Sequence, residues 1–201
     1  MLPHALKLAS SRIGHRPRSS VMHLFHHLLA SPIGNIVITT DADDVAHAVT
    51  LEERAADLPR LLTRLYGSHT VQEAPAPGVA AQALTRYFDG ELTALADIAV
   101  ARPGNALQRQ VWSALCDIPP GTVTHYGALA QTLSITDRGA AWKVGQANAA
   151  NPIAIVVPCH RVIGKNGMLT GFAWGVARKR WLLLHEGADL SDGGSLLLPG
   201  F

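Results

Sequence analysis

The segment from Asn151 to Val162, with the sequence NPIAIVVPCHRV, constrains this chain more than any other. An apolar, mostly β-branched run precedes Pro158, a pattern typical of a buried strand that a proline ends. The segment therefore predicts that Cys159 lies at a strand end, held rigidly but within reach. Free cysteine is also among the most buried residue types, so a core role is the alternative. The cationic or basic neighbours His160 and Arg161 favour a reactive thiol, because such groups raise the thiolate fraction.

Composition and cysteine usage predict a cytoplasmic protein of one domain or two small ones. The 201 residues are 48% hydrophobic, which is enough for a packed core. Only Cys116 and Cys159 are present, far apart in sequence, which argues against a disulfide framework and favours a reducing compartment. Cys116 lies in an amphipathic segment and is expected in the core. The sequence contains no apolar stretch of transmembrane length and no secretory h-region at its start.

Charge is distributed unevenly along the chain. Residues 1–20 carry four basic groups and no acid, residues 21–100 carry four basic and ten acidic groups, and residues 101–201 carry nine basic and five acidic groups. A polyanion would be repelled by the middle and attracted to the last part, so a nucleic-acid contact is expected in the C-terminal half. Residues 1–21 are expected to be a disordered basic extension, with Met22 as an alternative initiator.

Residues 22–100 are predicted to form a small α/β domain. Strand patterns at 23–30, 36–40 and 45–51 are separated by turn residues, as in an antiparallel sheet. Helical spacing follows over 53–66 and 79–88, with a polar loop between them. The Pro103-Gly104 pair predicts a linker. A second domain is then expected over 101–190, followed by a tail over 191–201.

The second domain is predicted to be mostly helical. Helices are expected from Leu107 to Ile118, over 126–133, over 138–149 with Asp137 as N-cap, and over 177–185 with Gly187 after its end. Two short helices joined by a tight turn, the second rich in Gly and Ala, match a helix-turn-helix. A plain helical hairpin with internally packed alanines is the alternative.

Five blocks of this half resemble the O6-alkylguanine-DNA alkyltransferases, which are also called methylated-DNA–protein-cysteine methyltransferases. The blocks are Arg109-Gln110-Val111-Trp112, Pro120-Gly121-Thr122-Val123 with Tyr126, Ala147-Asn148 leading to Asn151-Pro152, Pro158 to Gly164, and Arg178-Lys179 with Leu182-Leu183 and His185-Glu186-Gly187. The first half resembles the family more loosely, through residues 31–34 and 87–90. The resemblance implies a two-domain α+β protein. A small ribonuclease H-like antiparallel sheet with helices comes first, and a winged helix-turn-helix domain carrying the cysteine follows.

The resemblance implies direct DNA repair without a cofactor or a metal. The Cys159 thiolate would take the alkyl group from O6 of guanine, with O4-alkylthymine as a further candidate substrate, and the protein would be spent. His160 would take the thiol proton through a water, and Glu186 would orient the imidazolium. Some relatives bind zinc through Cys and His in the N-terminal domain, but here that domain offers only His23, His26 and His27 and no cysteine.

The resemblance also assigns the residues around the base. Asn151 would hold the turn that shapes the pocket, and Tyr126 would donate toward the guanine ring and help to rotate the nucleotide outward. Arg161 would be a structural or interdomain ion-pair residue, and Trp174 would narrow the pocket against large alkyl groups. The expected substrate-binding residues are Pro152, Val157, Pro158, Val162, Lys165, Phe172, Ala173 and Trp174.

The target base must leave the stack, so the family flips it with its helix-turn-helix against the minor groove of double-stranded DNA. Binding is expected to be sequence-independent and salt-sensitive, and the protein is expected to be a monomer in solution. The expected DNA-binding residues are Tyr126, Arg138, Ala141, Trp142, Lys143 and Gly145.

Two positions depart from the family pattern. Trp142 stands where typical members carry the arginine that enters the stack, and Trp lacks the donors for the orphaned cytosine. Lys143 is expected to compensate in part, and Phe172 replaces a usual Tyr.

Two alternative functions stay open. One is a DNA-binding lesion sensor with impaired transfer because of Trp142, and the other is a Cys-His hydrolase that turns over an acyl-enzyme.

Overall fold

The structure is a computed structural model that describes residues 21–190 except 166 and 170, and it divides into two compact units. The first unit comprises the chain up to Gly104 together with Pro152–Val156. The second comprises Asn105–Asn151 and the chain from Val157 onward. The extension expected before Val21 and the tail expected over 191–201 lie outside the described residues.

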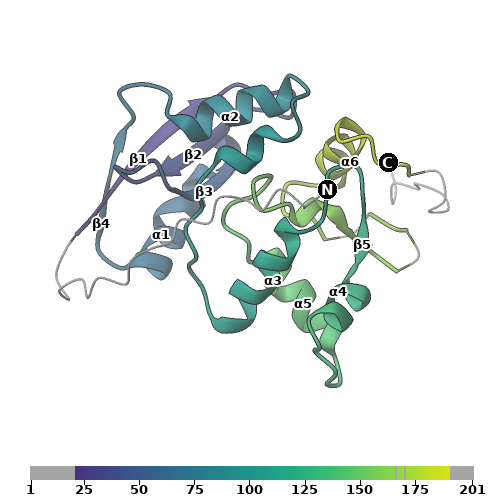
Figure 1. Ribbon diagram of the computed structural model, residues 1–201. Helices are drawn as coiled ribbons and strands as arrows, with labels where there is room; N and C mark the ends of the chain where they lie inside the picture. Colours follow the sequence, from purple (N-terminus) through teal and green to yellow (C-terminus); the bar gives the residue numbers. More distant parts are fainter. Residues whose placement is uncertain (1–20, 166, 170, 191–201) are drawn as a thin grey trace. The chain divides into compact units, whose positions relative to one another are not determined.

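A four-stranded sheet in the order β3-β2-β1-β4 forms the centre of the first unit (Figure 1). Its strands are β1 (Met22–Leu29), β2 (Ile36–Thr40), β3 (Ala46–Leu51) and β4 (His69–Glu73). The first three pair antiparallel, whereas β4 runs parallel to β1. The sheet is therefore mixed, and the expectation of an antiparallel sheet is wrong for β4. Its residues from 70 to 73 are exposed at the sheet edge and lack the apolar alternation that marks a strand.

Two helices cover opposite faces of this sheet. Leu24 and Val37 pack with Leu62 of α1 (Leu58–Tyr66), while Phe25 and Ile38 line a cavity with residues of α2 (Val79–Phe88) (Figure 1). Neighbouring residues of a strand point to opposite faces, so one strand serves both helices. The predicted helix over 79–88 is confirmed. The predicted helix over 53–66 begins as a 3₁₀ turn, η1 (Glu52–Asp57), and a further 3₁₀ turn, η2 (Ala94–Asp97), follows α2.

The second unit consists mainly of helices α3 (Ala106–Cys116), α4 (Tyr126–Thr132), α5 (Ala140–Ala149) and α6 (Val176–His185). The short strands β5 (Thr124–His125) and β6 (Val162–Ile163) pair in parallel. Asn105 and Gln108 form a capping box that starts α3. The Trp112 indole N–H donates to the Ala147 carbonyl at 2.8 Å and so ties α3 to α5. Within the described part of the chain, none of the helices is both long and apolar enough to cross a membrane.

Two local predictions, one for α5 and one for the segment before Cys159, are wrong. Helix α5 starts after Gly139, whose φ is 86°, and Asp137 forms an ion pair with Lys143 instead of capping the helix. The apolar run before Cys159 is not a continuous strand, because Ile155 has a φ of 70° and lies in a turn, and the run makes isolated bridges such as that of Ile153 to Val49. A positive φ is rare for a β-branched residue and interrupts the pleated conformation.

Candidate active site

Cys159 lies in a short 3₁₀ turn, η3 (Cys159–Arg161), and its exposed fraction is 7%. Its backbone N–H donates to the Val157 carbonyl at 2.8 Å, and the Arg161 N–H donates to the Pro158 carbonyl at 3.0 Å. The turn therefore replaces the strand end that the sequence predicted. It fixes the position of the thiol while keeping it almost out of water.

Two asparagines hold this turn, Asn148 in the last turn of α5 and Asn151 just after the helix. Asn151 Nδ2 donates to the Val157 carbonyl at 2.8 Å, and Asn148 Nδ2 donates to the Cys159 carbonyl at 3.4 Å. Burial raises the pKa of the Cys159 thiol, and a hydrogen bond from the Asn151 side chain, the charge of Lys179 and nearby backbone N–H groups act in the opposite direction. The structure thus brings Asn151 to the cysteine, as the sequence predicted.

His160, Arg161 and Glu186 form a buried network beside the thiol. His160 Nε2 lies 2.9 Å from Glu186 Oε1, and Arg161 donates to both carboxylate oxygens, each at 2.8 Å. Burial alone would raise the pKa of Glu186, but these hydrogen bonds outweigh it and lower that pKa to about 2. Arg161 also donates to the Ile118 carbonyl. The ion pair of Arg161 with Glu186 therefore lies inside the second unit. An interdomain ion pair was one of the two expectations for this residue.

The ionised Glu186 fixes the tautomer of His160. A carboxylate only accepts hydrogen bonds, so Nε2 carries the proton and Nδ1 keeps a lone pair. Nδ1 is buried and has no hydrogen-bond partner within the described residues. Burial lowers the pKa of His160, and the charges of Arg161 and Lys179 add to this effect against that of Glu186. The imidazole is therefore neutral at neutral pH and can accept a proton at Nδ1.

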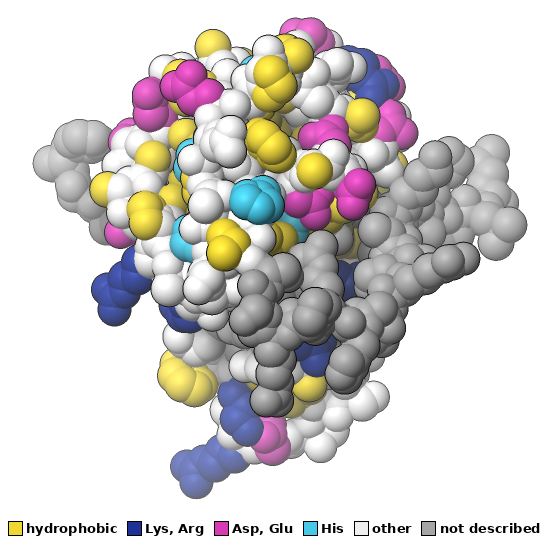
Figure 2. Space-filling model, turned by 90° about the vertical axis from the view of Figure 1, so that its left-hand side faces the viewer, with side chains coloured by type: hydrophobic (Ala, Val, Ile, Leu, Met, Phe, Trp, Pro, Cys, Tyr) yellow, Lys and Arg dark blue, Asp and Glu magenta, His cyan; other side chains and the backbone are white. Residues whose placement is uncertain are grey.

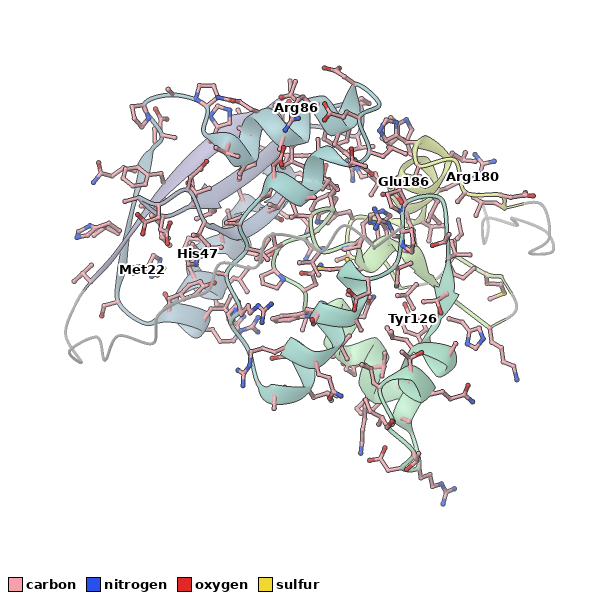
Figure 3. All side chains as sticks on the ribbon, in the orientation of Figure 1. Met22, His47, Arg86, Tyr126, Arg180 and Glu186 are labelled. Atoms are coloured by element: carbon pink, nitrogen blue, oxygen red, sulfur yellow. The ribbon has the colours of Figure 1, made fainter. Side chains whose placement is uncertain are left out.

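Tyr126 is the first residue of α4, and Figure 3 shows it beside the loop that precedes α6. A Cβ placed on Gly145 would lie 3.7 Å from the ring, and one on Gly171 would lie 3.4 Å from the hydroxyl. Tyr126 therefore lies within van der Waals distance of these positions on α5 and in the loop before α6. Burial raises the pKa of Tyr126, and a negative charge on Cys159 raises it further. The hydroxyl stays protonated and available as a donor.

The other predicted site residues fall into distinct groups. Pro158, Val162 and Trp174 are buried, and Phe172 packs edge-on against Trp174 with ring centroids 5.8 Å apart. Lys165 and Ala173 are exposed, and Pro152 belongs to the first unit.

Apart from Tyr126 on α4, the predicted DNA-binding residues lie on α5 and in the turn before it. Arg138, Ala141 and Trp142 are exposed, and Trp142 has an exposed fraction of 68%. Lys143, which was expected to compensate for Trp142, is held in the ion pair with Asp137.

Two residues of the site received no role from the sequence. Lys179 is fully buried, and it precedes Leu182, Leu183 and Glu186 at the i+3, i+4 and i+7 spacing of one helix face, which is a pattern that could have revealed its burial. Gly121 has a φ of 77°, and a Cβ there would lie 2.9 Å from the Glu186 carbonyl oxygen. The backbone around Gly121 can therefore approach the backbone of Glu186 closely only because the side chain is absent.

Residues 106–188 match the family model of the 6-O-methylguanine DNA methyltransferase DNA-binding domain, which defines the class of the second unit. The methylated-DNA–protein-cysteine methyltransferase of Salmonella typhimurium is 43% identical over 169 residues, which cover 83% of this chain and 98% of that protein. The Haemophilus influenzae protein of the same name is 35% identical, covering 86% and 91%. A crystal structure of the Mycobacterium tuberculosis O6-methylguanine methyltransferase is 36% identical with a TM-score of 0.67, covering 82% and 93%. This chain therefore belongs to the methylated-DNA–protein-cysteine methyltransferase family.

Proposed function

We propose that this protein repairs O6-alkylguanine in double-stranded DNA by moving the alkyl group onto Cys159, and that each molecule acts once. The observation that carries the proposal is the buried His160, the residue that follows Cys159, whose Nε2 is held by the ionised Glu186 while Nδ1 has no hydrogen-bond partner within the described residues. A similar protein, the Mycobacterium tuberculosis OGT, has been crystallised in complex with DNA and is 36% identical to this chain.

The reaction balances with the groups present. The thiol proton passes through a water to His160 Nδ1, and the thiolate attacks the sp³ carbon on O6. The S–C bond forms as the C–O6 bond breaks, and its electron pair goes to guanine. Tyr126 donates a hydrogen bond to the departing base, which finally takes up the proton. The products are guanine and a thioether, and because a thioether does not hydrolyse, Cys159 is not regenerated.

DNA is proposed to bind at α5 through the minor groove. Trp142 and Arg138 project from this region, while Ala141 and Gly145 are small enough to allow close approach of the backbone. The first unit is less suited to a polyanion, because Asp and Glu side chains gather on the face shown in Figure 2. Tyr126, on the adjoining helix α4, lies close to Gly145 and near enough to Cys159 to feel the charge of its thiolate, and it would meet the flipped nucleotide.

The test uses duplex DNA that carries a labelled methyl group on O6 of one guanine. We expect one equivalent of label on Cys159 per protein, no second turnover, and no labelling of the Cys159→Ala variant. Cys116→Ala is the matched control and should label normally, because Cys116 donates to the Trp112 carbonyl within α3. Catalytic release of the label would instead support a hydrolase, and binding without label would support a lesion sensor.

Replacing Trp142 with Arg is expected to tighten binding to methylated duplex by about tenfold at low salt. A hydrogen bond to a charged group contributes about 1.5–3 kcal/mol, and Trp offers the orphaned cytosine no comparable donors. Fluorescence anisotropy with a duplex containing O6-methylguanine measures the change. Trp142→Ala is the control and should bind more weakly than the natural protein, because stacking contributes about 1–3 kcal/mol per base. Equal binding by the natural protein and the Arg variant would contradict the idea that Trp142 limits base extrusion.

A further inference from the structure

His125 occupies an unusual position for a histidine, the N-cap of a helix. Helix α4 begins directly after it, and the backbone N–H of Ala128 donates to His125 Nδ1 at 3.0 Å. Serine, threonine, aspartate and asparagine are the residues that usually accept this bond. A Cβ built on Gly127 would lie 3.5 Å from Nδ1 and 3.7 Å from Cε1 of the same ring. The half-buried imidazole therefore lies against the first turn of α4.

The hydrogen bond fixes the chemical form of this imidazole. The Ala128 N–H can only donate, so His125 Nδ1 must offer a lone pair and the ring proton sits on Nε2. An imidazole that is protonated on both nitrogens has no acceptor and cannot cap a helix. His125 therefore caps α4 only as the neutral tautomer with its proton on Nε2.

Helix α4 depends on this cap because the helix is short. It contains seven residues, Tyr126–Thr132, and its first turn has no acidic residue to interact with the helix dipole. A helix of this length is marginal by itself, because few hydrogen bonds offset the cost of forming the first turn. Tyr126 is the first residue after the cap, so the position of its phenol follows the position of that first turn.

The backbone of His125 is tied to the segment that follows the nucleophile. In β5 it lies opposite Ile163 of the parallel strand β6. Strand β6 directly follows the turn η3, which carries Cys159. Strand β5 in turn leads straight into α4 (Figure 1). His125 thus joins the segment after Cys159, through its backbone, to the helix that carries Tyr126, through its side chain.

The position of Tyr126 is sensitive to small movements of α4. Its hydroxyl lies 3.4 Å from a Cβ built on Gly171, and its ring lies 3.7 Å from one built on Gly145. A shift of the first turn of α4 would change both contacts and the distance to Cys159, whose charge acts on the phenol. A misplacement of about 1 Å can slow an enzymatic reaction by about a hundredfold.

We propose that His125 is a positioning residue that acts through Tyr126: its neutral imidazole caps α4 and so holds the phenol in place for the flipped base. The proposal rests on the proposed function and deepens it, because Tyr126 is the donor to the departing guanine. A different side chain that caps equally well should serve the same purpose. His125→Asn is therefore expected to keep what His125→Ala loses.

The first test follows the tyrosine rings by NMR without DNA, so its outcome does not depend on the proposed repair activity. The chain has three tyrosines, Tyr66, Tyr87 and Tyr126, and Tyr126→Phe assigns the ring ¹³C signal of the last. We expect this signal to move toward its position in an unfolded chain in His125→Ala and to return in His125→Asn. Tyr66 and Tyr87 lie in the first unit and are internal controls for the fold.

An unchanged Tyr126 signal in His125→Ala would overturn the proposal, and so would a signal that moves equally in His125→Asn. If His125→Ala does not fold, the natural protein gives the answer. The scalar coupling between the Ala128 amide nitrogen and His125 Nδ1 then reports the cap directly, and its absence would refute the proposal.

The second test measures single-turnover methyl transfer at saturating methylated duplex. His125→Ala is expected to be about three- to tenfold slower than the natural protein, and His125→Asn to stay within about twofold of it. His69→Ala is the matched control, because His69 Nδ1 also contacts the backbone, 2.9 Å from the Gly67 carbonyl, but in the first unit. Equal rates for His125→Ala and the natural protein would contradict the proposal. A complete lack of transfer by the natural protein would refute the repair function instead, and the tyrosine signals would still decide whether His125 positions Tyr126.

Discussion

Replacing Glu186 with Gln is expected to lower the free energy of unfolding by about 3–5 kcal/mol. The carboxylate is buried and accepts hydrogen bonds from His160 and from two nitrogens of Arg161. An amide removes the negative charge and leaves the Arg161 guanidinium buried without it. Globular proteins are stable by only about 5–15 kcal/mol, so this is a large fraction of the total. Urea unfolding followed by tryptophan fluorescence measures the loss.

The pH dependence identifies the carboxylate as the cause. The pKa of Glu186 in the folded protein is about 2, which is below the value of about 4.3 expected in the unfolded chain. The stabilisation is therefore fully present above the unfolded pKa and is lost as the pH falls toward 2. The difference between the natural protein and Glu186→Gln should shrink over this range.

Glu91→Gln is the matched control, because Glu91 makes an ion pair with Arg86 at 2.9 Å on the surface. Exposed pairs of this kind contribute about 0–1 kcal/mol, so its effect should be small. If Glu186→Gln proved no more harmful than Glu91→Gln, the buried network would not be the stabilising element that its geometry indicates.

The sequence indicated which residues would lie together better than it predicted their backbone. Cys159, His160 and Glu186 stand in short blocks that resemble the family, and the structure places His160, the residue after Cys159, in contact with Glu186. The backbone before Cys159 was not predicted correctly. Ile155 adopts a positive φ, which no local sequence pattern indicates, and the expected strand becomes a turn. An apolar run shows that a segment is buried but does not fix its conformation.

The polar residues were harder to place for a related reason. The strand β4 was missed because an exposed edge strand needs no apolar alternation, and Asp137 was expected to cap α5 although it pairs with Lys143. Lys179 is a charged residue that the structure buries. Its helical spacing with Leu182 indicates the core, whereas its charge is typical of the surface. Tertiary contacts decide such positions, and only the structure shows them.

Replacing His160 with Gln is expected to slow methyl transfer at pH 7 by about 10²–10⁴-fold. The Gln amide can still donate to Glu186 in place of Nε2, so the fold should be largely kept. It offers no base in place of Nδ1, which is the nitrogen left without a hydrogen-bond partner within the described residues. Single-turnover transfer from a methylated duplex, with thermal unfolding measured alongside, separates the two effects.

The pH profile then identifies the step that His160 performs. Without the base, the thiol must lose its proton to solvent, so the deficit of His160→Gln should shrink as the pH rises toward the pKa of Cys159. Transfer by His160→Gln within a few-fold of the natural rate at pH 7 would mean that His160 is not the base that generates the nucleophile. A large loss that is rescued at high pH would assign proton removal to the histidine.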